Sequence, residues 1–327
     1  MQNQQTSLRN LPPSEPTKVH WSKEVPGLQT RVNSSAIGEY KTCARKYWYK
    51  WVRGLRAREP KIDLEFGTWF HSGVQGYESL RNEGESHEEA LAATVDWALF
   101  ITWDSGVKRP RQIDHSSKNR EGLVRTLIWY LDKYGEEDVL ETVVLPDGAL
   151  ATELEFEFDS GYCASSGERI SFCGKLDRIV NFAGGRYIRD IKTTGGSLGS
   201  FFFRNFTPGN QFSLYPIAGQ ICFGIETKGI ICDGVEIKGS FARFERALIP
   251  RNKEGLNEWL EDSHIWLAQM DRSACEDSWP MNDMACGAFG GCEFREICSM
   301  RPEARESWIQ RGWISREAAQ ENKENVP

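Results

Sequence analysis

Three consecutive stretches of alternating apolar and polar residues, between residues 149 and 194, constrain the fold of this chain more than any other feature. The first is ALATELEFEFDS, the second covers residues 168–182 after a Ser/Gly turn, and the third covers residues 186–194 after Ala183-Gly184-Gly185. Period-two alternation is typical of strands with one buried face, and short Gly-containing turns join neighbouring strands. The pattern therefore predicts an antiparallel meander.

On both sides of this meander, apolar residues recur with the spacing of helices. A helix is expected from an N-cap at Ser35 to Trp51. The other predicted helices lie near residues 64–82, 87–103, 119–134, 211–222 and 254–271. Two more strands are expected within residues 228–250. The elements together predict a mixed α/β fold, in which helices flank a central sheet, with a helical N-terminal region and a C-terminal cysteine loop.

The length of 327 residues and the formal charge of −7 limit the class of protein. We expect one domain over residues 33–300, between polar tails at residues 1–32 and 301–327. The sequence has no run of about 18 apolar residues and no secretory signal, so a cytoplasmic protein without a membrane partner is expected. The acidic balance disfavours a protein that binds DNA through its overall charge.

Two acids and a lysine lie in the second and third predicted strands. Residues two apart in a strand point to the same face, so Asp190 and Lys192 project together. If Phe182 pairs with Gly185 across the turn, Asp177 lies directly opposite Asp190. Two carboxylates that face one point favour a divalent cation such as Mg²⁺ or Mn²⁺ between them. An Asp–Lys ladder on the protein surface is the alternative.

Phosphodiester hydrolysis is the chemistry that such a site supports. A metal held by Asp177, Asp190 and the carbonyl oxygen of Ile191 can polarise a phosphoryl oxygen and lower the pKa of a bound water. Lys192 can orient that water or offset charge in the transition state.

The chain before the second strand is strongly acidic, with nine acids and no bases between residues 136 and 159. Glu153 and Glu155 alternate on the first predicted strand, where they face either the metal or water. The density of negative charge favours a solvated acidic edge.

Four motifs resemble, in the same order, those of the RecB-type branch of the PD-(D/E)XK nuclease superfamily. They are Gly67-Thr-Trp-Phe-His71, Gly174-Lys-Leu-Asp177, Asp190-Ile-Lys192 and Gln211-Phe-Ser-Leu-Tyr215. The resemblance implies a restriction-endonuclease-like fold from about Ser35 to Cys298. It also implies roles for six side chains: Asp177 and Asp190 as the main metal ligands, His71 as a further ligand, Lys192 as the catalytic lysine, and Gln211 with Tyr215 lining the site.

Three of the nine cysteines, Cys286, Cys292 and Cys298, recur at six-residue steps near the C-terminus. Regular thiol spacing suggests a metal or cluster, and three thiolates are one short of the four that a [4Fe–4S] cluster or structural zinc normally takes. The segment around Cys43 resembles the one that supplies the first cysteine in RecB-type nucleases with an iron–sulfur cluster. Cys43 is therefore the fourth ligand by resemblance, and the lack of a Cys-x-x-Cys knuckle favours the cluster over zinc.

Such ligation would act as a structural clasp, because Cys43 and Cys286 lie 243 residues apart in the chain. Closing so long a loop has an entropic cost that grows with the logarithm of its length, and cluster binding would offset that cost. The cluster module is expected to consist of residues 35–53 and 275–300.

A basic segment from Lys41 to Lys61 carries eight Lys and Arg against one acid. Aromatic residues interleave with these charges, a combination typical of contacts with phosphates and unpaired bases. The predicted DNA-binding residues are Arg45, Lys46, Tyr49, Lys50 and Arg53. Helical spacing places Tyr47, Trp48 and Trp51 in the core and leaves Tyr49 as the free ring.

These features predict a metal-dependent DNA nuclease, most closely an exonuclease, with Mg²⁺ or Mn²⁺ at its site and a structural [4Fe–4S] cluster. Its predicted partner is DNA with single-stranded or frayed ends. Two alternatives remain: a catalytically inactive DNA-binding module of the same fold, and a zinc-stabilised adaptor that binds proteins.

Overall fold

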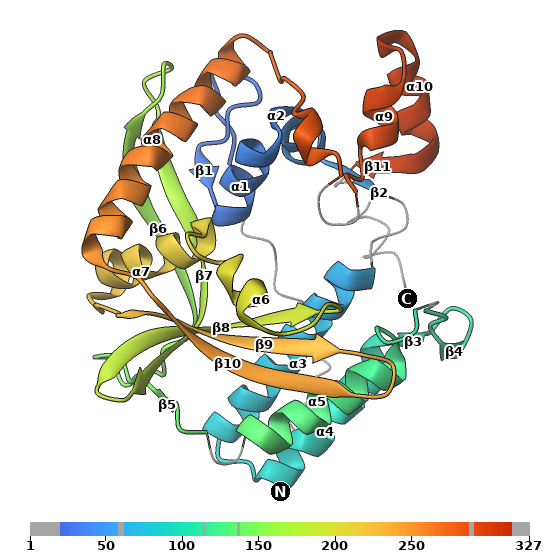
Figure 1. Cartoon of the computed structure of the whole chain (residues 1–327), viewed down its shortest axis with the longest axis vertical. Coiled ribbons are helices and arrows are strands. Elements are labelled where there is room, and N and C mark those ends of the chain that lie inside the picture. The colour runs from blue at the N-terminus through green and yellow to red at the C-terminus, as the bar shows by residue number, and fades with distance from the viewer. Residues whose placement is uncertain (1–19, 58–61, 114, 136–137, 288–290, 316–327) are drawn as a thin grey trace, which may run out of the picture.

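The computed structural model describes residues 20–57, 62–113, 115–135, 138–287 and 291–315. A mixed sheet crosses the molecule, with one group of helices on each face (Figure 1). Its central strands follow the order β1-β7-β8-β9-β10, and β5 and β6 also pair with β7. The strands of this sheet are β1 (Arg31–Val32), β5 (Glu141–Thr142), β6 (Thr152–Cys163), β7 (Arg169–Phe182), β8 (Gly185–Thr194), β9 (Gly229–Ile237) and β10 (Ala242–Pro250).

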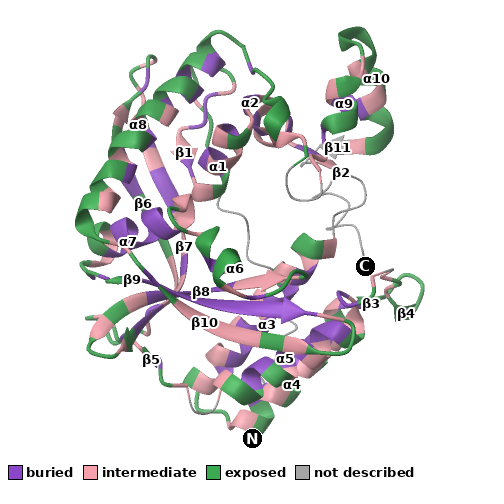
Figure 2. Cartoon of the chain, viewed as in Figure 1, coloured by how far each residue is buried: buried purple, intermediate pink, exposed green. Residues whose placement is uncertain are grey.

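The predicted meander is confirmed, because β6 pairs antiparallel with β7 and β7 pairs antiparallel with β8. The next strand, β9, lies parallel to β8, so the chain crosses over the sheet between them, as parallel neighbours require. All nine residues of β9 are buried, since helices cover both of its faces (Figure 2). The predicted mixed α/β architecture is therefore confirmed.

Helices account for most of the remaining chain. One group covers one face of the sheet: α3 (Ile62–Asn82), α4 (His87–Ile101) and α5 (Arg120–Tyr134). The other face is covered by α1 (Ser34–Thr42), α7 (Asn210–Phe223) and α8 (Lys253–Cys275). The shorter helices are α2 (Ala44–Tyr47), η2 (Trp48–Val52), α6 (Ser200–Arg204), η3 (Asp283–Ala285), α9 (Arg295–Ser299) and α10 (Pro302–Gly312). No helix within the described ranges is long and apolar enough to cross a membrane.

The prediction of a single helix from Ser35 to Trp51 is wrong, because the helix is interrupted at Cys43. Asn33, rather than Ser35, caps α1 by accepting a hydrogen bond from the backbone N–H of Ala36 at 2.8 Å. Cys43 adopts extended dihedral angles (φ −166°, ψ 114°), and the helix resumes as α2 and then as the π-helix η2. The break projects the Cys43 thiol from a helix junction instead of along a helix flank.

The predicted tails are also shorter than expected. At the N-terminal end, Leu28 is buried and β1 pairs parallel with β7. At the C-terminal end, α10 is followed by β11 (Trp313–Ser315), which pairs antiparallel with β2 (Leu55–Ala57). The few apolar residues of this polar segment are sufficient to fix it, because Ile309 and Trp313 pack into a small core that also contains Tyr49. A further small ribbon consists of β3 (Trp103–Asp104) and β4 (Arg109–Pro110).

Candidate active site and thiol-lined cavity

The turn between β7 and β8 brings the two predicted carboxylates together. Phe182 pairs with Gly185, as predicted, and the antiparallel pairs continue to Arg178 and Arg189. Asp177 and Asp190 are the next residues along the two strands. From that point β8 pairs with β9 and β7 pairs with β6. The carboxylates therefore lie where β7 and β8 part, which leaves space between the strands for a third group.

We call the point where β7 and β8 part the fork. The side chain of His71, on α3, reaches the fork. Its Nδ1 lies 3.6 Å from Asp177 Oδ2, and its Nε2 lies 2.7 Å from the carbonyl oxygen of Ile191. Gly67, one turn earlier, lets the helix approach β8 closely, because a Cβ at this position would lie 3.3 Å from Thr193 Oγ1. The Gly-x-x-x-His motif thus combines a close helix–strand contact with an imidazole directed at the fork.

Lys192 and the two motif residues of α7 form one hydrogen-bonded group with Asp190. The Lys192 Nζ lies 2.8 Å from Asp190 Oδ2 and donates a hydrogen bond to Gln211 Oε1 at 2.9 Å. Gln211 Nε2 in turn donates to Asp190 Oδ1 at 3.1 Å and to the Tyr215 hydroxyl oxygen at 2.7 Å. The spacing of four residues places Gln211 and Tyr215 on the same face of α7, where both reach the fork.

Burial and neighbouring charge set the protonation of this group. Burial raises the pKa of Asp190, Lys192 opposes that rise, and Asp177 adds to it. For Lys192, burial by itself lowers the pKa, but the adjacent Asp190 and Asp177 outweigh burial and raise it. Burial, with the charges of Asp177 and Asp190, raises the pKa of Tyr215 well above its ordinary value. The lysine is therefore held as a cation and the tyrosine as a neutral hydroxyl.

Glu153, which the sequence left open between the metal and water with water favoured, lines the cavity of the site. The β6–β7 register pairs Thr152 with Arg178 and Leu154 with Leu176, which places Glu153 opposite Asp177. Its side chain forms an ion pair with Lys175, and burial raises its pKa. The expected solvated edge is thus wrong for Glu153.

Glu153 also has a left-handed backbone conformation, with φ at +53°. Such a conformation is uncommon for a residue other than glycine and tends to occur at functional sites. Glu153 and Asp190 both lie close enough to Asp177 for its negative charge to raise their pKa values, so three acids from β6, β7 and β8 gather at the fork. The alternating acids of β6 were visible in the sequence, but the register that aims one of them at the fork was not.

A cavity of about 490 Å³ opens beside this group of acids. Asp177, His71, Gln211 and Tyr215 line it, and Asp190, which is only 1% exposed, contacts the lining through Gln211. Asp177 Oδ2 is buried and has no hydrogen-bond partner, so it is an oxygen with a free coordination position. Two carboxylates, a carbonyl and an imidazole match the ligands of a hard divalent cation. As they stand, however, no three His, Cys, Asp or Glu side chains in the described ranges are grouped to hold a metal ion.

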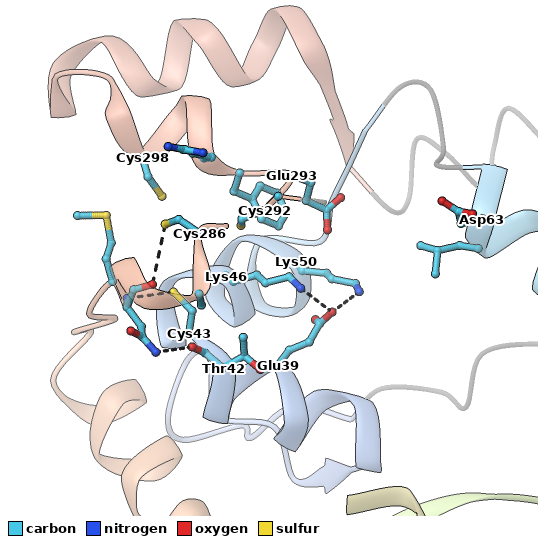
Figure 3. A pocket seen from close by; sticks show the side chains of 17 residues that line it. Glu39, Thr42, Cys43, Lys46, Lys50, Asp63, Cys286, Cys292, Glu293 and Cys298 are labelled. Atoms are coloured by element: carbon cyan, nitrogen blue, oxygen red, sulfur yellow. Dashed lines mark hydrogen bonds and ion pairs between the residues drawn. The ribbon is translucent and has the colours of Figure 1, made fainter. Parts of the chain in front are cut away.

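The four cysteines singled out in the sequence line a second cavity, of about 410 Å³. Cys43 projects from the junction of α1 and α2, Cys286 follows η3, Cys292 lies in the next loop and Cys298 lies in α9 (Figure 3). All four are free thiols. The structure therefore brings together cysteines that are separated by up to 255 positions in the chain (298 minus 43).

Most of the predicted DNA-binding residues are engaged within the protein. Lys46 and Lys50 both form ion pairs with Glu39, Arg53 pairs with Glu306, and Arg45 donates to the carbonyl oxygen of Trp279. The expectation that Tyr49 is a free ring is wrong, because this side chain is 1% exposed and stacks on Phe294. The π-helical turn is the physical reason: its wider spacing directs Tyr49 inward, where an α-helical projection would direct it outward.

The fold and the fork of acids around a lysine define a nuclease. The chain matches the model of the PD-(D/E)XK nuclease superfamily over residues 31–299 and belongs to that superfamily, so its substrate is nucleic acid.

Comparison with individual proteins gives weaker likenesses. The chain is similar to a candidate exonuclease from Eubacterium rectale, with a TM-score of 0.46 and 10% identity over 78% of this chain and 87% of that chain. It is also similar to the protein SSO0001, with a TM-score of 0.34 and 13% identity over 86% of this chain and 89% of that chain. A segment of 51 residues is 41% identical to protein Rev of Maedi visna virus (strain 1514) and covers 16% of this chain and 30% of Rev.

Proposed function

We propose that this nuclease is a metal-dependent deoxyribonuclease of the RecB-type branch that hydrolyses phosphodiester bonds as an exonuclease. The observation that carries the proposal is the fork itself. Asp177, Asp190 and Lys192 converge there with Gln211 and Tyr215, and a buried carboxylate oxygen of Asp177 has no hydrogen-bond partner. An intact lysine in this position argues against the alternative of an inactive DNA-binding module.

The residues of the fork would position a phosphodiester and balance its charge. Lys192 has three N–H donors; it donates one to Gln211 Oε1 and forms an ion pair with Asp190, which leaves donor capacity for a water or a phosphoryl oxygen. The Tyr215 hydroxyl accepts from Gln211, which leaves its own proton to donate toward the cavity. Both groups are fixed before substrate arrives, and preorganised donors of this kind stabilise charge in a transition state.

We propose Asp177, Asp190, the carbonyl oxygen of Ile191 and His71 as the ligands of Mg²⁺ or Mn²⁺. When bound there, the ion would polarise a phosphoryl oxygen and lower the pKa of a coordinated water. The Asp177 Oδ2 atom supports this assignment: it is buried and has no hydrogen-bond partner, with His71 Nδ1 3.6 Å away, and a buried anionic oxygen is costly unless a cation compensates it.

For the thiol-lined cavity we propose a structural [4Fe–4S] cluster held by Cys43, Cys286, Cys292 and Cys298. Four cysteines from two separate segments line one cavity, and this donor set suits an iron–sulfur cluster or zinc. Residues 35–53 and 275–300 would then form a module of the single nuclease domain, joined to residues 302–315 by the packing of Tyr49. The zinc-stabilised adaptor is the alternative that metal analysis separates.

The test uses single- and double-stranded DNA labelled at either end, incubated with Mg²⁺, Mn²⁺ or a chelator. We expect stepwise shortening from one end in the presence of metal, none with chelator, and none with the Asp190→Asn variant. An internal-cut ladder would replace the exonuclease assignment by an endonuclease. Cleavage that persists at the wild-type rate in Asp190→Asn would show that the fork is not the active site.

A further inference from the structure

The cavity at the fork, which Asp177, Gln211 and Tyr215 line, has little positive charge available to a ligand. Its carboxylates are Asp177, Glu153 and Glu155, whereas its lysine, Lys175, is already paired with Glu153. A nucleic-acid strand carries one negative charge on each phosphate, so its entry needs cations besides any metal. Among the lining residues, Arg56 is the guanidinium that can meet this need.

Arg56 lies on β2 and lines this cavity. The strand is held by its antiparallel pairing with β11, where Arg56 pairs with Ile314. Glu39 and Glu293, which line the thiol-lined cavity, are close enough to influence its charge. Within the described ranges Arg56 nevertheless forms no ion pair with a carboxylate, and Glu39 is already engaged by Lys46 and Lys50. Its strand is therefore held in place, and no carboxylate of the described residues neutralises the guanidinium by direct pairing.

Trp51 lines the same cavity a few residues earlier in the chain. Its indole Nε1 donates a hydrogen bond of 2.7 Å to Glu39 Oε2, which fixes the orientation of the ring. An indole that borders a cavity can stack on an unpaired base, and such stacking tolerates any base because every base has a π-face. A cation and an aromatic ring that line one cavity are the two parts of a single-strand binding site.

We infer that Arg56 and Trp51 form a substrate-positioning subsite for single-stranded nucleic acid. Arg56 contacts a backbone phosphate and Trp51 stacks on a neighbouring base, so the strand is held against the wall while a phosphodiester lies at the fork. The inference rests on the proposed function, because it assigns the substrate class of the same cavity. It replaces Tyr49, which is buried, as the aromatic contact.

The experiment measures binding separately from cleavage. A fluorescein-labelled single-stranded oligonucleotide is titrated with protein in chelator, at several salt concentrations, and its anisotropy gives Kd. The variants are Arg56→Gln, Arg56→Lys, Trp51→Leu and the matched control Arg272→Gln, an exposed arginine of α8 that lies outside both cavities. Melting temperatures of all variants are recorded to verify folding.

We expect Arg56→Gln to weaken binding about tenfold and to reduce the slope of log K against log salt by about 0.7, the value for one phosphate contact on a single strand. Arg56→Lys keeps a cation and should retain the wild-type slope. Trp51→Leu should weaken binding about tenfold on an ordinary strand, and much less on an abasic strand, because the base is the stacking partner. Arg272→Gln should match the wild type.

A second arm compares the wild-type protein with Arg56→Gln on modified strands. A single neutral methylphosphonate is moved along the strand. One position should weaken binding by the wild-type protein but have no further effect in Arg56→Gln.

The phosphate contact would be overturned if folded Arg56→Gln kept the wild-type slope of log K against log salt. It would also be overturned if no methylphosphonate position weakened binding by the wild type alone. Equal loss on abasic and ordinary strands for Trp51→Leu would overturn the stacking. The proposed function fails separately: wild-type protein that binds the strand but does not cleave it with Mg²⁺ or Mn²⁺ refutes the nuclease proposal and leaves the subsite standing.

Discussion

Lys192 keeps its charge inside the protein because three neighbours stabilise it. Asp190 supplies a negative charge at 2.8 Å, the Gln211 side chain accepts a hydrogen bond, and the Phe212 ring lies 5.7 Å from the ammonium. Burial by itself would lower the pKa of Lys192, but the charges of Asp190 and Asp177 raise it. A lysine fixed in this way differs from the flexible ion-paired lysines of the surface, and its position next to two acids is explained by the proposed reaction.

The substitution Lys192→Gln tests that role. The glutamine preserves polarity and much of the volume but removes the positive charge, so we expect kcat to fall at least about 10²-fold, as for the loss of one preorganised donor in other active sites. Single-turnover cleavage of end-labelled DNA measures the change. Circular dichroism should show unchanged secondary structure, and a folded variant that cleaves at the wild-type rate would contradict the assignment.

At this scale, the sequence predicted what depends on local register and failed where backbone geometry changes. The short turn made the pairing of Phe182 with Gly185 predictable, and the antiparallel pairs run from there to Arg178 and Arg189, one residue before Asp177 and Asp190. The buried position of Tyr49 could not be predicted, because no residue pattern indicates a π-helical turn. The position of Glu153 depends on a register between strands joined by a longer connection and on an unusual positive φ.

At the scale of elements, the glycines of the motifs act through packing. Gly174 lies opposite Phe156 in the β6–β7 pair, and a Cβ at Gly174 would lie 2.7 Å from the Phe156 ring. The ring fills the space above the glycine and forms part of the main core. The motif Gly174-x-x-Asp177 therefore joins a packing position to a functional one on the same strand.

We expect Gly174→Ala to destabilise the fold by about 1–3 kcal/mol, because overpacking forces a buried side chain from its rotamer. Urea denaturation followed by tryptophan fluorescence measures the change in the free energy of unfolding. Any destabilisation by Gly148→Ala would have a different cause. Gly148 has open space around it, but its φ is +86°, which an alanine rarely adopts. Adding Phe156→Leu to each variant distinguishes the two causes. In that background, the stability lost through Gly174→Ala should be recovered, whereas the stability lost through Gly148→Ala should stay the same.

The positions of the helices and strands around the core were largely predictable because periodic apolar spacing dominates them. The expected helices near 64–82 and 254–271, for example, correspond to α3 and α8. The described parts of the segments that the sequence assigned to tails, residues 20–32 and 301–315, are folded by a few apolar contacts across the chain. Such contacts leave no periodic signal, so β1, α10 and β11 could not be predicted.

At the scale of the whole molecule, the C-terminal segment covers the thiol-lined cavity through a stack of aromatic rings. Tyr49 stacks on Phe294 with ring centroids 5.2 Å apart, and Phe294 stacks on Trp313 at 4.6 Å. The rings come from η2, from the loop that carries Cys292 and from β11. Stacking of this kind stabilises contacts beyond the area that it buries.

We expect Trp313→Ala to lower the free energy of unfolding by about 1–3 kcal/mol, less than for a fully buried tryptophan because Trp313 is half-buried. Urea denaturation measures this loss. Trp129→Ala, which removes an exposed tryptophan of α5, serves as the control and should have a smaller effect. Equal losses in both variants would show that the aromatic stack contributes nothing to stability.

The proposed cluster would close the largest loop in the molecule, and its removal should therefore loosen one region and spare another. In Cys298→Ser, we expect anaerobically purified protein to lose most of its iron and sulfide. Hydrogen exchange should accelerate in residues 44–57 and 291–315, where the ligands and the aromatic stack lie, and remain slow in β7 and β8. Cys163→Ser, an exposed cysteine outside the cavity, should retain wild-type iron. Zinc without iron in the wild type, or full iron in Cys298→Ser, would refute the cluster, because four thiolates from distant segments are the only feature that assigns it.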